Sequence, residues 1–262
     1  MREVPRFSPI SAYLNTRLSH EFRLGEGVNL WVYGVGYLNL PDHSLARYLT
    51  EEELLYCKNR LNRLAGRFAA KVALMRAVGT GLNWTDINIH PSETGQPVVQ
   101  IGEESKDIIR NKGFSQYRLS ISHDEGIAIG FAAAIPENFQ GSLQIGVDVT
   151  SNDRFRELME KSRNRLYAIV FSEREVDDSQ EDPQELAIRW ASKEAVVKVL
   201  ETGFKQGVGR KDVEIRPESG NSFSVNLVGK ALERAKALSL TDWSILVVPN
   251  DSLAIAFVAA HS

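Results

Sequence analysis

The chain has 262 residues, of which 43% are hydrophobic and 25% charged, as in an ordinary soluble protein that is long enough to bury a core. Its formal net charge of -3 gives no sign of a nucleic-acid partner or of an anionic membrane surface. Cys57 is the single cysteine, which excludes an internal disulfide framework and fits a reducing compartment.

The N-terminal segment, residues 1–27, is mixed in character, and we interpret it as a lead-in to the first strand. It lacks the apolar core of a signal peptide, and no run in the chain approaches transmembrane length. We therefore expect a cytoplasmic protein with no membrane partner. Residues 28–35 are rich in Val, Leu, Trp and Tyr, which predicts a strand.

The next feature is a helix start, because Thr50 and Glu53 have the spacing of a capping box. Apolar residues then recur over positions 54–75 at intervals of three and four. This pattern predicts one long amphipathic helix that ends near Gly79 or Gly81. After it we expect, in order, strands at 86–90 and 97–101, a helix at 103–111, and strands at 117–124 and 126–134.

Two charged features stand out further along the chain. Asp148 interrupts an apolar strand, and a charge there needs a cation or strong hydrogen bonds, since burying it bare costs several kcal/mol or more. Residues 185–200 contain no Gly or Pro, which favours a helix. On this helix Trp190, Glu194 and Lys198 are four residues apart and lie on one face. Two carboxylates from different elements plus a lysine are what magnesium-assisted phosphoryl chemistry requires.

The second half of the sequence repeats the first. Thr50 and Glu53 are matched by Ser172 and Glu175 at an offset of 122 residues, which becomes 126 after a short insertion. Further pairs at these two offsets are Arg67 and Arg189, Phe68 and Trp190, Lys71 and Lys193, Tyr117 and Trp243, and Ala128 and Ala254. We therefore predict an α+β pseudo-dimer of two similar halves, 1–137 and 138–262, each a small, mostly antiparallel sheet packed on a long helix. Because such a chain supplies both halves itself, we expect a monomer.

The two copies differ in their charged residues. Glu194 aligns with Val72, so the first copy lacks this carboxylate, while Ser122 and His123 align with Val248 and Pro249 in the second copy. Each half retains what the other lacks. This division predicts one composite site at the junction of the halves.

Four motifs carry a resemblance to a known family. They are Gly146-Val-Asp148, Phe171-Ser-Glu-Arg-Glu175, Trp190-x-x-Lys193-Glu194-x-x-x-Lys198 and Leu119-Ser-Ile-Ser122-His123. In this order and spacing, the set resembles the 4′-phosphopantetheinyl transferase superfamily. The two-half architecture looks like the surfactin-synthetase-activating type, and each half in detail looks like the shorter holo-acyl-carrier-protein synthase.

The resemblance implies a transferase that moves the phosphopantetheine arm of coenzyme A to a serine of an apo acyl or peptidyl carrier protein and releases 3′,5′-ADP. It also implies dependence on magnesium, and whether manganese replaces magnesium stays open.

The resemblance implies a role for each matching residue. Asp148 and Glu194 match the metal ligands, and Lys198 matches the lysine near the pyrophosphate. As a mechanism, we expect Glu194 to take the serine proton, directly or through a metal-bound water, and Lys198 to stabilise the departing 3′,5′-ADP. Ser122 and His123 match residues that contact the nucleotide phosphates, and Arg67 offers a positive charge toward the 3′-phosphate.

Two positions depart from the family pattern. Thr150 stands where many two-half members have a third acidic ligand, so a hydroxyl or a water would complete the metal site. Gln96 stands where a lysine often helps to hold the nucleotide, which removes one positive charge near the phosphates.

Each of these residues has an ordinary alternative when it is considered alone. Glu194 and Lys198 have the spacing of a solvated helix pair, and an arginine could neutralise Asp148. Two further functions stay open, namely a non-catalytic module that binds coenzyme A or a carrier protein, and a metal-dependent phosphohydrolase. A hydrolase triad of Ser122, His123 and Asp148 is a weak hypothesis, because adjacent residues of a strand, such as Ser122 and His123, point to opposite faces.

Overall fold

The computed structural model describes residues 15–17, 22, 24, 27–38, 44–79, 81–93, 95–204, 207–218, 223–249 and 251–262. Most of the N-terminal lead-in lies outside these ranges. The first half contains β1 (Asn15–Arg17), β2 (Asn29–Gly36), the short helix η2 (Ala46–Tyr48), α1 (Glu51–Cys57), α2 (Leu61–Val78), η3 (Trp84–Asp86), β3 (Ile87–Pro91), β4 (Pro97–Ile101), α3 (Glu103–Asn111), β5 (Phe114–Asp124) and β6 (Ile127–Pro136).

The second half contains β7 (Leu143–Ser151), α4 (Asn152–Ile169), α5 (Glu173–Asp178), α6 (Pro183–Val199), η5 (Arg210–Asp212), β8 (Val213–Pro217), β9 (Phe223–Leu227), α7 (Gly229–Ala237), β10 (Asp242–Pro249) and β11 (Leu253–His261). The predicted division at residue 137 falls in the connection between β6 and β7, and it stays a prediction.

The prediction of one long helix after Thr50 is wrong. Helix α1 ends at Cys57, and α2 begins at Leu61. Lys58 and Asn59 between them have left-handed backbone angles, with φ of 50° and 56°, which stop a right-handed helix. No Gly or Pro marks this break, so the apolar periodicity runs through it in the sequence. None of the helices in the described part is long and apolar enough to cross a membrane.

The sheets confirm the α+β pseudo-dimer. The first half holds a sheet of order β1-β2-β6-β5 and the second a sheet of order β7-β11-β10-β9-β8, and all strand pairs in the described ranges are antiparallel. The order β2-β6-β5 thus recurs as β7-β11-β10. The hairpin β3–β4 forms a separate two-stranded sheet, whereas its counterpart β8–β9 extends the second sheet.

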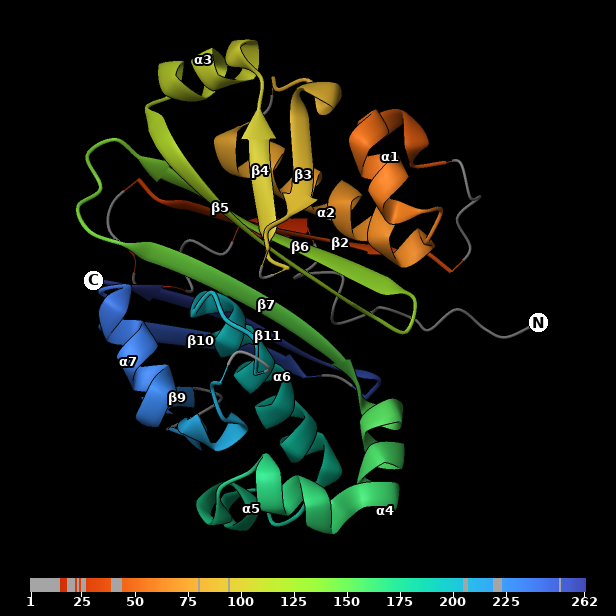
Figure 1. The fold of residues 1–262 in the computed structure, drawn as a ribbon, viewed down its shortest axis with the longest axis vertical. Coiled ribbons are helices and arrows are strands. Elements are labelled where there is room, and N and C mark those ends of the chain that lie inside the picture. The colour runs from red at the N-terminus through yellow and green to blue at the C-terminus, as the bar shows by residue number, and fades with distance from the viewer. Residues whose placement is uncertain are drawn as a thin grey trace.

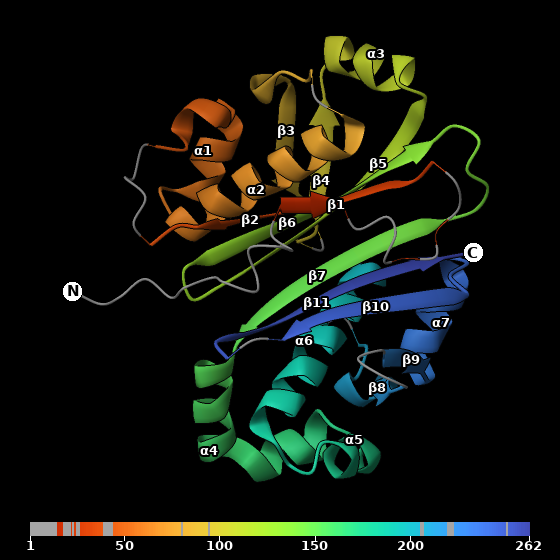
Figure 2. The same ribbon diagram turned by 180° about the vertical axis from the view of Figure 1, so that it is seen from behind.

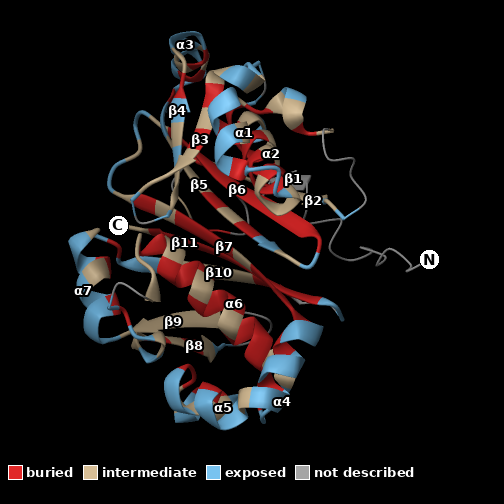
Figure 3. Cartoon of the chain, turned by 45° about the vertical axis from the view of Figure 1, so that its right-hand side comes forward, coloured by how far each residue is buried: buried red, intermediate tan, exposed pale blue. Residues whose placement is uncertain are grey.

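The two sheets pack face to face between the two long helices, α2 on one outer side and α6 on the other (Figures 1 and 2). Successive residues of β6 and of β11 point alternately into the core between the sheets and toward the long helix of their own half. Ile129 and Phe131 of β6 point into the core between the sheets, whereas Ala132 of β6 packs toward α2. Phe131 meets its repeat partner Phe257 edge-on, with ring centroids 5.4 Å apart. Figure 3 shows this buried layer running through the middle of the molecule.

Each half contains the same buried ion pair. The ammonium of Lys71 lies 2.6 Å from the carboxylate of Glu53, and that of Lys193 lies 2.7 Å from Glu175. All four side chains are at most 1% exposed. Both glutamates also close capping boxes, which confirms the repeat that the sequence indicates at these positions.

Candidate functional site

Asp148 lies on β7 where that strand passes along β5 of the first half. Its Oδ1 atom accepts hydrogen bonds from the Ser122 hydroxyl at 2.8 Å and from the Lys198 ammonium at 2.9 Å. The Thr150 hydroxyl donates to Oδ2 at 3.4 Å. The Asp148 side chain is only 13% exposed, so these partners stabilise a charge that burial alone would disfavour.

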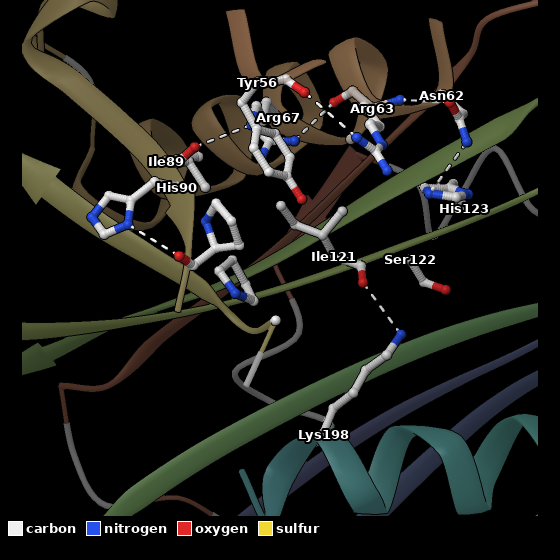
Figure 4. A pocket seen from close by; sticks show the side chains of 14 residues that line it. Tyr56, Asn62, Arg63, Arg67, Ile89, His90, Ile121, Ser122, His123 and Lys198 are labelled. Atoms are coloured by element: carbon white, nitrogen blue, oxygen red, sulfur yellow. Dashed lines mark hydrogen bonds between the residues drawn. The ribbon is translucent and has the colours of Figure 1, made fainter. Parts of the chain in front are cut away.

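Lys198 joins the two halves through its ammonium group. Besides Asp148, it donates to the backbone oxygen of Val147 on β7 at 2.7 Å and to that of Ile121 on β5 at 3.2 Å. Figure 4 shows the side chain reaching from α6 to Ile121. An ammonium has three N–H donors, and these three acceptors match that number. Lys198 therefore supplies the cation that the sequence led us to expect beside Asp148.

Glu194 lies one helical turn before Lys198 and faces the same region. Its carboxylate lines a cavity of about 450 Å³ together with Asp148 and Thr150. Burial, and after it the negative charge of Asp148, raise the pKa of Glu194 above its usual range. Within the described part of the chain, no hydrogen bond to this carboxylate is present. The site thus holds two carboxylates that repel each other, of which only Asp148 is ion-paired with Lys198.

A second cavity, of about 390 Å³, is lined by Lys198 and is shown in Figure 4. Arg67 lies in its wall and is 8% exposed, with its Nε atom donating to the Ile89 oxygen at 3.1 Å. The guanidinium carbons of Arg67 and Arg63 lie 4.4 Å and 5.2 Å from the ring centre of Tyr56, within the range of cation–π contacts. The cavity is therefore lined by two fixed arginines and by Lys198.

Ser122 and His123 line both cavities and so connect them. The Ser122 hydroxyl accepts from the backbone N–H of Val149 at 3.2 Å while it donates to Asp148, so its orientation is fixed. His123 lies at the rim, with Nε2 3.5 Å from the amide nitrogen of Asn62. The surrounding protein removes water from part of the imidazole, which lowers the pKa of His123, and the positive charge of Lys198 acts in the same direction.

Gln96 lies at the tip of the β3–β4 hairpin and contacts the other half of the molecule. Its Nε2 atom donates to the backbone oxygen of Lys198 at 3.3 Å. It lines a third cavity, of about 340 Å³, which also includes Glu194 and Lys198. Unlike Arg67, it is not part of the wall of the 390 Å³ cavity.

The structure brings the seven residues singled out in the sequence to one junction. Glu194 and Lys198 lie between three neighbouring cavities, and the remaining five line one or two of them. The hydrolase triad is not formed, because the Ser122 hydroxyl donates to Asp148 and the His123 ring contacts Asn62 instead.

The oxygen donors at the site suit a hard cation. No group of three or more His, Cys, Asp or Glu side chains that could hold a metal exists in the described ranges. Asp148 and Glu194 nevertheless face one cavity, with the Thr150 hydroxyl beside them. Magnesium is commonly held by one or two carboxylates and keeps several waters, so this donor set fits such an ion. An ion there would also offset the negative charge of Asp148, which adds to the effect of burial on the pKa of Glu194.

Sequence reasoning missed some of the residues that form the site. Arg63 belongs to a basic stripe on α2 that is more often solvated, yet its side chain lines the 390 Å³ cavity. Tyr56, Asn62 and His90 line the same cavity. The sequence signal for Arg63 was its spacing from Arg67 on one helix face. No such signal existed for Tyr56, because its contacts with these arginines depend on the unexpected break between α1 and α2.

The second half of the sequence matches a known protein family. The family model of the 4′-phosphopantetheinyl transferase superfamily matches residues 144–258. A holo-[acyl-carrier-protein] synthase of Chlorobium limicola is 38% identical over 44% of this chain and 88% of that protein, and the one of Hydrogenovibrio crunogenus is 37% identical over 45% and 95%. Among solved structures, holo-[acyl-carrier-protein] synthase of Helicobacter pylori in complex with coenzyme A is 22% identical with a TM-score of 0.41, covering 44% of this chain and 98% of that one.

Proposed function

Because the chain belongs to the 4′-phosphopantetheinyl transferase superfamily, we propose that it transfers the phosphopantetheine arm of coenzyme A to a serine of an apo carrier protein. The observation that carries this proposal is the junction at which Asp148, Glu194 and Lys198 of the second half meet Ser122 of the first. In the reaction, the serine oxygen bonds to the phosphorus that carries pantetheine, and the phosphoanhydride bond to 3′,5′-ADP breaks.

Coenzyme A would bind with its nucleotide end in the 390 Å³ cavity. Arg67 and Arg63 supply fixed positive charge there, and His123 with Ser122 closes the side toward Asp148. Arginine side chains suit phosphate groups because their planar forks donate several hydrogen bonds. The pyrophosphate would then lie beside Lys198, between this cavity and the one lined by Glu194.

Asp148 and Glu194 would hold magnesium, or manganese in its place, with water completing the shell. The ion would neutralise charge that develops on the pyrophosphate as its bond breaks. Glu194 would accept the proton of the carrier serine, a role that a carboxylate positioned beside the reacting group can perform. Lys198 would act on the leaving 3′,5′-ADP mainly through its charge, because its three N–H groups already have acceptors.

The carrier protein would approach from the side of α4. This helix carries five basic and three acidic residues, and Arg154, Leu158 and Lys161 of it line the 450 Å³ cavity. A basic helix with an exposed leucine, next to the site of proton transfer, favours an acidic protein partner. Because the sheet-to-sheet core already joins two similar halves, the proposal includes a monomeric enzyme, and it places the reaction in the cytoplasm.

The decisive experiment is the intact mass of an apo acyl or peptidyl carrier protein after incubation with this protein, coenzyme A and magnesium. We expect a gain of one phosphopantetheine that EDTA prevents. Binding of coenzyme A without transfer to any of several carriers would favour the non-catalytic module instead. Release of phosphopantetheine or phosphate with no carrier present would indicate a phosphohydrolase.

A further inference from the structure

The tip of the β3–β4 hairpin is the place where the first half contacts the end of α6. Two hydrogen bonds join Ser92 and Gln96 there, since Ser92 N–H donates to the Gln96 oxygen at 2.7 Å and Gln96 N–H donates to the Ser92 hydroxyl at 3.1 Å. Gly95 adopts φ of 90°, which a side chain would disfavour. The backbone of Gln96 is therefore held in place, and its side chain extends toward the second half.

The acceptor of the Gln96 side chain lies in the last turn of α6. Carbonyl groups at a helix C-terminus lack the full set of helical partners, so a side chain that donates to them stabilises the helix end. The Lys198 oxygen accepts from the N–H of Glu201 at 3.1 Å and from Gln96 Nε2 at 3.3 Å. Gln96 thus caps α6 from the opposite half of the protein.

Both ends of Lys198 are consequently held by the first half. Gln96 binds its backbone oxygen, and the Ile121 oxygen accepts from its ammonium at 3.2 Å. The same ammonium orients Asp148 at 2.9 Å. Any movement of the helix end would displace this ammonium and with it the carboxylate. Gln96 also borders the cavity on the Glu194 side rather than the one lined by Arg67.

We propose that Gln96 is a positioning residue, which acts on the reaction through Lys198 and does not bind the nucleotide phosphates. The inference rests on the proposed transferase activity. It gives a structural role to Gln96, which stands where the family pattern often has a lysine. There, an uncharged amide fixes the end of α6, and the positive charge for the nucleotide comes from Arg63 and Arg67.

The test compares Gln96→Met with the matched control Gln100→Met, an exposed glutamine of the same hairpin. Methionine keeps the length of the side chain but has no N–H to donate. We expect Gln96→Met to lower kcat roughly tenfold, since small misplacements of catalytic groups can cost up to about 10²-fold, and to leave the KM for coenzyme A nearly unchanged. The control variant should match the wild type in both constants.

A second readout does not depend on turnover. Hydrogen exchange of backbone amides at residues 199–202 should be faster in Gln96→Met than in the wild type and in Gln100→Met. A raised KM for coenzyme A with unchanged kcat would overturn the proposal, because it would mean direct binding of the substrate. Unchanged exchange at the end of α6 would overturn it as well. Failure of the transferase function itself would appear differently, as a wild-type protein that loads no carrier.

Discussion

The two halves of the molecule share a scaffold and differ at the position of the site. The strand registers show which residues of the two halves correspond. Asp148 lies opposite Ala256, and Tyr33 lies opposite Gly130, which is the repeat partner of Ala256. The position of Asp148 is thus taken by Tyr33 in the first half, and the position of Glu194 by Val72. A cavity of about 300 Å³ remains there, lined by Tyr48, Phe68, Val72, Met75, Arg76 and Trp84.

The first half has filled its copy of the site with aromatic rings. Phe68 and Trp84 stack with centroids 5.6 Å apart, and Tyr33 meets Phe68 edge-on at 6.0 Å. By contrast, the buried pairs Lys71–Glu53 and Lys193–Glu175 persist in both halves. We therefore assign the ion pairs that recur in both copies to the fold, and we expect the carboxylates Asp148 and Glu194, which occur in one copy only, to serve the proposed reaction. This comparison separates Glu194 from Glu175, although both are glutamates of the second half.

The largest effect should come from Glu194→Gln, which removes a group found in one half only. We expect the transfer rate to fall by about 10²–10⁴-fold, the range typical of a lost general base, with an unchanged melting temperature. Carrier loading by mass spectrometry and thermal unfolding measure the two quantities. Glu185→Gln on the same helix should keep full activity. Val72→Glu should not restore transfer to the Glu194→Gln protein, because Tyr33 stands where a second carboxylate would be needed.

The next effect concerns the groups that both halves share. Lys71→Met and Lys193→Met should each lower the free energy of unfolding by about 3–5 kcal/mol, since each leaves a buried carboxylate without its cation. Replacing both partners, as in Glu53→Leu with Lys71→Met, should not recover this loss, because Glu53 also accepts hydrogen bonds from the backbone N–H groups of Thr50 and Ile89. Denaturant unfolding measures these differences. Loss of transfer in Lys193→Met without loss of stability would contradict the assignment of this pair to the fold.

A smaller effect is expected where the two helices approach their sheets. A methyl group on Gly130 would lie 2.4 Å from the backbone of Ala69 and Ala70 in α2. Gly130→Ala should therefore cost about 1–3 kcal/mol through overpacking. Its repeat partner is already an alanine, and Ala256→Gly should cost only about 0.5–1 kcal/mol. Equal losses of unfolding free energy in the two variants would mean that α2 and α6 pack alike.

The smallest effect is expected at Cys57, whose repeat partner Ser179 donates to the Val176 oxygen at 2.8 Å. Cys57→Ser should change the free energy of unfolding by no more than about 1 kcal/mol, because the new hydroxyl has the equivalent Leu54 oxygen within its turn.

Burial raises the pKa of the Cys57 thiol. Alkylation of the native protein should consequently be slow at neutral pH and accelerate only above the usual thiol range, as mass spectrometry can follow. Fast alkylation at neutral pH would mean that α1 opens readily.

The sequence predicted local structure and the repeat well, because capping boxes, apolar periodicity and matched offsets are local or internal signals. It placed Asp148 on a strand and Glu194 and Lys198 on one helix face, as observed. It could not predict the break after Cys57, where two residues with side chains adopt a left-handed backbone. Nor could it predict that Lys198 uses its donors on carbonyl groups of two different strands, because that pairing exists only once the halves are docked.

The connection between β6 and β7 has a further consequence. It is a tether, and its ends are tied to the two sheets, since Glu137 N–H donates to Gly113 O at 3.1 Å and Ser262 N–H donates to Ser142 O at 3.2 Å. A short tether keeps the local concentration of one half around the other near the millimolar range, whatever the protein concentration. Specific activity should therefore be insensitive to dilution. If the two halves were produced separately, the fraction of molecules with an assembled site would depend on their concentrations.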